Sequence, residues 1–138
     1  MAEFKYQEPF PIQKDSTEYR LLTKDYVKTI EVEGRKILKI QKEGLELLAR
    51  EAYTDVSFYL RASHLQKLAN ILKDPEASDN DKFVAHTMLM NQVVAAAGEL
   101  PTCQDTGTAI AIGKKGENVW TDGNDAEAIS KGVFETYR

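Results

Sequence analysis

The sequence has a single cysteine, Cys103, among 138 residues. One cysteine excludes an intrachain disulfide. With only two histidines, His64 and His86, it also excludes a four-ligand structural zinc site. We expect both histidines to be ordinary surface or core side chains. A metal-binding or redox role for Cys103 therefore requires partners from outside these residues.

An excess of basic charge and a long apolar run are also missing. Lys and Arg number 18 against 22 Asp and Glu, and the net charge is −4. Because phosphate binding requires clustered Lys and Arg, we expect no nucleic-acid partner. No apolar run approaches the roughly 20 residues that span a bilayer, and residues 1–5 lack the basic-then-apolar order of a secretion signal. We therefore expect no membrane partner and a cytoplasmic location.

The hydrophobic content, 42%, is typical of a chain that builds one core. Residues 1–20 contain Pro9 and Pro11 and show no sustained period, which predicts an extended N-terminal arm. Residues 21–138 are predicted to form one α+β domain, mostly helical with two β-hairpins. Alternation on either side of Gly34 predicts the first hairpin over 26–40.

The second hairpin is predicted from alternation in 109–112 and 119–121. Residues 113–116, with the sequence Gly-Lys-Lys-Gly, would form its turn. The simplest interpretation of Lys114 and Lys115 is that both lie in a solvated turn.

Apolar residues at three- and four-residue spacings predict four helices, near 42–60, 63–74, 80–97 and 126–137. We expect the second to begin at Ser63 with Gln66 completing a capping box, and the third to be capped by Ser78 or Asp79. The faces expected to pack are Leu45, Leu48, Ala49, Ala52, Val56, Tyr59 and Leu60 in the first helix, Leu65, Leu68, Ile71 and Leu72 in the second, and Ala128, Ile129, Gly132 and Val133 in the fourth. In the third helix Phe83, Thr87, Met90, Val94 and Ala97 form one stripe, and a free fragment is expected to expose part of residues 88–97 together with the Cys103 loop.

The loop of residues 100–109, Leu-Pro-Thr-Cys-Gln-Asp-Thr-Gly-Thr-Ala, concentrates chemically capable side chains. Polar groups placed between an alanine-rich helix end and an apolar strand need partners if they are buried, and a bound polyanion or metal would supply them. Simpler interpretations stay open: Cys103 as a small buried residue, Asp105 as a turn residue, and Gln104 as a solvated amide.

Several motifs together resemble the N-terminal region of the class I (iron–sulfur, dimeric) fumarate hydratases. They are Cys-Gln-Asp-Thr-Gly-Thr-Ala at 103–109, Gly-Lys-Lys-Gly at 113–116, Val-Trp-Thr at 119–121 and Ser-Lys-Gly-Val at 130–133. The likeness extends back through 80–81, 71–77, 59–61 and 48–52 and into the arm, so it covers essentially the whole chain.

The resemblance implies a hydro-lyase that interconverts fumarate and (S)-malate with a 4Fe-4S cluster. It implies that Cys103 is one of three thiolate ligands, while the fourth iron has no protein ligand and takes the substrate. It further implies that Gln104 and Asp105 contact the substrate, with Asp105 as a catalytic residue. We assign Thr106, Gly107 and Thr108 to shaping the loop.

In that family the two other cysteine ligands, the base and the substrate-binding arginines lie in segments that would follow Arg138. We therefore expect this chain to be a fragment that is inactive and free of the cluster by itself. Its partner would be the remainder of its own chain, within a homodimer. Two alternatives stay open: a tartrate dehydratase or other hydroxy-diacid hydro-lyase of the same family, and a noncatalytic module in which Cys103 is a reactive thiol.

Overall fold

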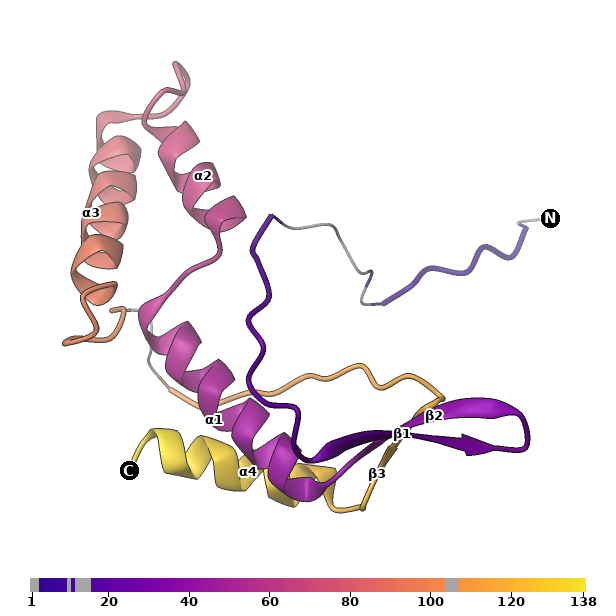
Figure 1. Ribbon diagram of the computed structural model, residues 1–138. Coiled ribbons are helices and arrows are strands. Elements are labelled where there is room, and N and C mark those ends of the chain that lie inside the picture. Colours follow the sequence, from indigo (N-terminus) through magenta and orange to yellow (C-terminus); the bar gives the residue numbers. More distant parts are fainter. Residues whose placement is uncertain (1–2, 10, 12–15, 104–106) are drawn as a thin grey trace.

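A computed structural model describes residues 3–9, 11, 16–103 and 107–138 (Figure 1). The described residues form helices and one three-stranded sheet, which confirms the α+β class. In chain order the elements are β1 Val27–Val32, β2 Arg35–Ile40, α1 Lys42–Phe58, α2 Ala62–Ile71, α3 Asp79–Ala95, β3 Val119–Thr121 and α4 Asp125–Thr136. The described residues before Thr23 contain no helix or strand, and the division into an arm and a domain stays a prediction.

The first hairpin forms as the sequence predicts. Strands β1 and β2 are antiparallel, and Val32 pairs with Arg35 across a two-residue turn. Both turn residues are left-handed, with φ of 50° at Glu33 and 76° at Gly34. This conformation matches the right-handed twist of the flanking strands, and glycine adopts it without steric cost.

The prediction of a second hairpin is wrong. Strand β3 pairs with β2 in parallel, with Leu38 opposite Val119 and Ile40 opposite Thr121, and residues 109–116 form no strand. Parallel neighbours need a long crossover connection, which the segment containing α1, α2 and α3 provides. Alternation in the sequence marks extended segments but does not specify which edge they pair with, and this explains the error.

The helices pack as two pairs, α1 with α4 and α2 with α3 (Figure 1). Helix α4 approaches α1 through Gly132, where a Cβ atom would overlap the carbonyl oxygen of Glu46 and lie 2.7 Å from Cβ of Ala49. Ala128 and Gly132 are buried, which confirms the predicted inward face of α4.

Helix starts follow the predictions in part. Ser78 caps α3, accepting a hydrogen bond from the backbone N–H of Asp81 while the Asp81 carboxylate accepts one from the N–H of Ser78. Helix α2 instead begins at Ala62 with Arg61 as its N-cap, so the capping box at Ser63 is wrong. Gln66 reaches forward to Asn70 one turn later, an alternative that an amide at this spacing offers.

The predicted core face of the first helix is largely exposed: Leu48 and Val56 in α1 and Tyr59 at its C-cap are exposed. In α3 the stripe of Phe83, Thr87, Met90 and Val94 is exposed too, and for residues 88–97 this is the exposure expected of a free fragment. The buried apolar side chains among the described residues are mainly alanines: Ile37, Ala49, Leu68, Ala85, Ala95 and Ala128. The periodicity identified apolar faces correctly, but an apolar face is buried only where another helix or strand packs against it.

The accessible surface reflects this small core. The chain exposes 11558 Å², whereas a compact protein of the same mass exposes about 7,200 Å². The extended N-terminal residues contribute to the excess, as do the uncovered faces of α1 and α3. None of the helices in the described part of the chain has the length and apolar composition that crossing a membrane requires.

Candidate functional site

The chain returns from α3 over the C-terminal end of α1 just before Cys103. The backbone N–H of Thr102 donates to the carbonyl oxygen of Ser57 at 2.7 Å, and Thr102 is only 6% exposed. This bond uses a carbonyl at the end of α1 that has no partner within its own helix. The residue before Cys103 is therefore fixed against a helix end.

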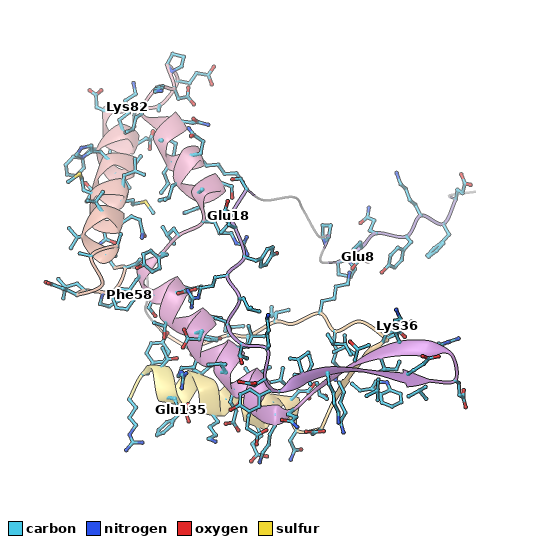
Figure 2. The ribbon with its side chains drawn as sticks, in the orientation of Figure 1. Glu8, Glu18, Lys36, Phe58, Lys82 and Glu135 are labelled. Carbon is cyan, nitrogen blue, oxygen red and sulfur yellow. The ribbon has the colours of Figure 1, made fainter. Side chains whose placement is uncertain are left out.

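Helix α3 holds the same segment from a second direction. The backbone N–H of Cys103 donates to Oδ1 of Asn91 at 3.0 Å. The next residue, Gln92, is 7% exposed and donates from Nε2 to the carbonyl oxygen of Phe58 at 2.6 Å. Figure 2 shows Lys82 at one end of α3 and Phe58 close to the other end, where α1 and α3 meet. Two adjacent side chains of α3 thus bind the loop and the end of α1.

The Cys103 side chain is a free thiol and is exposed. The interpretation of this residue as a small buried side chain is therefore wrong. A hollow of about 150 Å³ lies beside the cysteine, lined on α3 by Phe83, Val84, Thr87, Met88 and Asn91. The main chain at Cys103 is held while its sulfur stays accessible, and this is an arrangement in which a thiolate can bind a metal from outside the chain.

The other predicted loop residues are only partly described. Gln104, Asp105 and Thr106 lie outside the described residues. Gly107 has a φ of 92°, a conformation that favours glycine, and Thr108 is exposed. The assigned roles of these five residues remain predictions.

Lys114 and Lys115 are exposed as predicted, and both are engaged in ion pairs. Lys114 pairs with Glu8 at 2.9 Å, and Lys115 pairs with Asp125 at 2.7 Å. The hydrogen bond from Lys115 lowers the pKa of the Asp125 carboxyl, and the Thr121 hydroxyl acts in the same direction. The Lys115–Asp125 pair connects the segment before β3 to the start of α4, and the Lys114–Glu8 pair connects it to the N-terminal residues.

A complete metal site is absent from the described residues, in which no three His, Cys, Asp or Glu side chains gather. His64 and His86 are both exposed and lie in helices, in agreement with the ordinary roles expected for them. Iron–sulfur clusters are usually bound by thiolates, and this chain has one thiol. The chain therefore fits a 4Fe-4S cluster as the source of one of its ligands.

Sequence patterns gave no indication of the residues that hold the loop, which are Ser57, Asn91 and Gln92. Asn91 and Gln92 lie outside the apolar stripe from which α3 was predicted, and nothing in their spacing links them to Cys103. A buried polar side chain needs a hydrogen-bond partner. Gln92 would therefore have indicated a tertiary contact, but its burial is known only from the structure.

Comparison with known proteins agrees with the resemblance found in the sequence. Residues 46–138 match the family model described as fumarate hydratase (Fumerase). The aerobic class I fumarate hydratase of Escherichia coli K12 is 58% identical over 134 residues, covering 97% of this chain and 24% of that protein. The anaerobic class I enzyme of the same strain matches at 58% identity with the same coverage.

A eukaryotic relative is also similar. Fumarate hydratase 2 of Leishmania major is 50% identical over 113 residues, covering 82% of this chain and 20% of that protein. The chain thus spans about a quarter or less of the length of these curated relatives. The resemblance inferred from the loop motifs is confirmed, and the chain belongs to the fumarate hydratase family.

Proposed function

We propose that this chain forms part of a class I fumarate hydratase, which reversibly adds water to fumarate to give (S)-malate, and that Cys103 is one thiolate ligand of its 4Fe-4S cluster. One observation supports this most directly: the sulfur of Cys103 is exposed while its backbone is bound by Asn91. The 58% identity to the Escherichia coli enzymes supports the reaction and the substrate class.

The cluster would supply an open iron that acts as a Lewis acid toward the substrate hydroxyl and a carboxylate. The contribution of this chain is a soft thiolate ligand at Cys103, the ligand type that iron–sulfur clusters use. The hydrogen bonds at Thr102 and Cys103 hold the main chain at this position. Little reorganisation of that main chain would then be needed when the sulfur binds iron.

The residues after Cys103 would act on the substrate. The Gln104 amide would donate a hydrogen bond to a substrate carboxylate. The Asp105 carboxylate would orient the substrate hydroxyl or accept its proton, which is general acid–base work for a positioned carboxylate. Thr106, Gly107 and Thr108 would shape the loop that presents these side chains.

The 138 residues contain one cysteine, and the proposed cluster takes three thiolates. We therefore expect the chain alone to retain no cluster and to hydrate no fumarate. The complete enzyme would be a homodimer in the cytoplasm. The residue that removes the C–H proton would come from outside the 138 residues.

The test is a chimera in which this chain replaces the matched quarter of the Escherichia coli aerobic enzyme. After anaerobic reconstitution it should be brown and should hydrate fumarate, whereas the chain alone should lose its iron on desalting. In the chimera, Cys103→Ser should keep its circular dichroism spectrum and lose bound iron and sulfide. Unchanged iron content in that variant would refute the role of Cys103, and preferential dehydration of tartrate would identify the reaction as that of a different hydroxy-diacid hydro-lyase.

A further inference from the structure

An extended segment crosses the molecule between the Cys103 loop and β3. Figure 1 shows it in orange, running beside α1 toward the sheet. In the described structure, the backbone groups of residues 107–115 form no hydrogen bonds with other backbone groups, and every residue from 107 to 118 is exposed. Unpaired extended backbone of this length is a template for another strand.

The side chains of this segment are apolar on both faces. Ala109 and Ala111 line a hollow of about 850 Å³ that α1 and α4 also line, through Leu45, Leu48, Ile129 and Val133 among others. Ile110 and Ile112 are 74% and 72% exposed. A strand with one solvated face alternates apolar with polar residues, whereas apolar residues on both faces are typical of a central strand covered on both sides.

Both ends of the segment are already anchored. At one end, Thr102 and Cys103 are bound by Ser57 and Asn91. At the other end, Lys115 pairs with Asp125, and the N–H of Val119 donates to the carbonyl oxygen of Gly116 at 3.1 Å. The part between these two ends is extended, and its backbone groups have no backbone hydrogen-bond partners in the described structure.

We propose that residues 108–113 form a strand that is covered on both faces and pairs with a strand from the part of the fumarate hydratase polypeptide that lies outside the quarter matched by this chain. The inference rests on the proposed function, since it takes the partner strand from the same enzyme. The incoming strand would supply backbone donors and acceptors to residues 108–113. Apolar side chains accompanying it would fill the hollow beside Ala109 and Ala111.

The amount of exposed surface favours this occupant over a second copy of the chain. The surface exceeds that of a compact protein of this mass by about 4,300 Å², of which the extended N-terminal residues supply part. The uncovered apolar residues lie on separate faces of α1, α3 and the segment 107–118, and a standard protein–protein interface covers only about 800 Å² on each partner, so one copy would not cover all of these faces. The relatives have about three quarters of their length outside the matched region, enough to cover the remaining faces.

Strand addition would also affect the candidate site. Residue 108 follows Cys103 by five positions, so pairing of 108–113 would fix the far side of the loop whose near side Asn91 and Ser57 already hold. Strand pairing and positioning of the cluster ligand would then be coupled.

Amide hydrogen exchange followed by mass spectrometry tests the proposal on iron-free protein. In the chain alone, the amides of 109–112 should exchange within about tenfold of the unstructured rate, while those of α1 and α4 are protected. In the chimera with the Escherichia coli enzyme they should exchange at least about 100-fold more slowly. If the chimera does not fold, the unaltered Escherichia coli enzyme is measured at the aligned positions, and fast exchange there overturns the proposal.

Matched variants in the chimera separate strand pairing from simple burial. Ile110→Pro removes a backbone donor and should abolish protection over 109–112, whereas Ile110→Val, which suits a strand, should retain it. Protection in the chain alone, accompanied by a dimer in light scattering, would show that a second copy is the occupant and overturn the proposal. Protection in the iron-free chimera, without hydratase activity after anaerobic reconstitution of the cluster, would contradict only the proposed function, and activity after reconstitution without protection would contradict only the strand.

Discussion

The backbone N–H of Cys103 and Oδ1 of Asn91 are joined by a hydrogen bond of 3.0 Å across twelve positions of the sequence. Asn91 lies in the last two turns of α3, and Gln92 beside it binds the end of α1. The loop that carries the candidate thiolate therefore takes its position from two helices, and Asn91 is a positioning residue for Cys103.

Asn91→Leu should release the Cys103 backbone. We expect the Cys103 amide to exchange about tenfold faster and the free energy of unfolding to fall by about 1 kcal/mol, the net contribution of one such hydrogen bond. In the chimera this variant should also bind less iron. Asn91→Asp, which keeps an acceptor oxygen, should restore slow exchange. The control Asn70→Leu removes an amide that binds Gln66 on α2 and should leave Cys103 unchanged, and equal effects from both leucine variants would refute the positioning role.

Gly132→Ala should destabilise the α1–α4 pair. The added methyl group would overlap the carbonyl oxygen of Glu46 and lie 2.9 Å from the backbone nitrogen of Arg50, so the helices must move apart. Overpacking of this kind costs about 1–3 kcal/mol, which urea unfolding will measure. Gly113→Ala is the matched control, because a Cβ at that position meets nothing within 4 Å. Similar losses from the two substitutions would contradict the close helix contact.

The Asp125–Lys115 pair predicts a specific dependence of stability on pH. Because Lys115 and Thr121 lower the pKa of Asp125 in the folded state, the ionised carboxylate is favoured by folding. This contribution is complete above the ordinary aspartate pKa of about 3.9 and is lost as the pH falls through the lower folded-state value.

Asp125→Asn and Lys115→Met should therefore each flatten the acid side of the stability curve. At neutral pH the loss should be small, below about 3 °C in Tm, because the pair is at the surface. Thermal unfolding between about pH 6 and pH 2 measures the effect. An acid limb as steep as that of the unaltered chain in both variants would show that the pair does not couple to folding.

Asp105→Asn in the chimera should separate catalysis from cluster binding. An amide cannot accept a proton as the carboxylate does, so we expect fumarate hydration to fall at least about 100-fold. Iron and sulfide content should stay close to that of the unaltered chimera. Equal losses of iron and of turnover would instead indicate that Asp105 helps to hold the cluster.

Local sequence patterns predicted much of the fold. The turn places Gly34, which tolerates a left-handed backbone, between two alternating segments, so the first hairpin could be inferred without its surroundings. The cap at Ser78 is equally local, because its donor and acceptor lie three positions apart. The Cys103 motif identified the family because it is a contiguous string of residues, and the comparison with known proteins confirmed that inference.

Such patterns could not predict contacts between segments that are distant in the sequence. Strand character in 119–121 was visible, yet pairing with β2 in parallel depends on the route of three intervening helices. The apolar stripe of α3 was visible too, yet whether it is covered depends on surfaces that no periodicity describes.

The contact between Asn91 and Cys103 shows most clearly which features depend on the local sequence and which depend on the tertiary structure. The order of side chains along the chain sets helix lengths, caps, turns and the chemical nature of the loop, because these depend on neighbours within a few positions. Which helix holds the loop, which strand edge stays open and whether the Cys103 thiol stays exposed are set by packing in three dimensions, because only the folded backbone brings residues twelve or more positions apart within hydrogen-bonding distance.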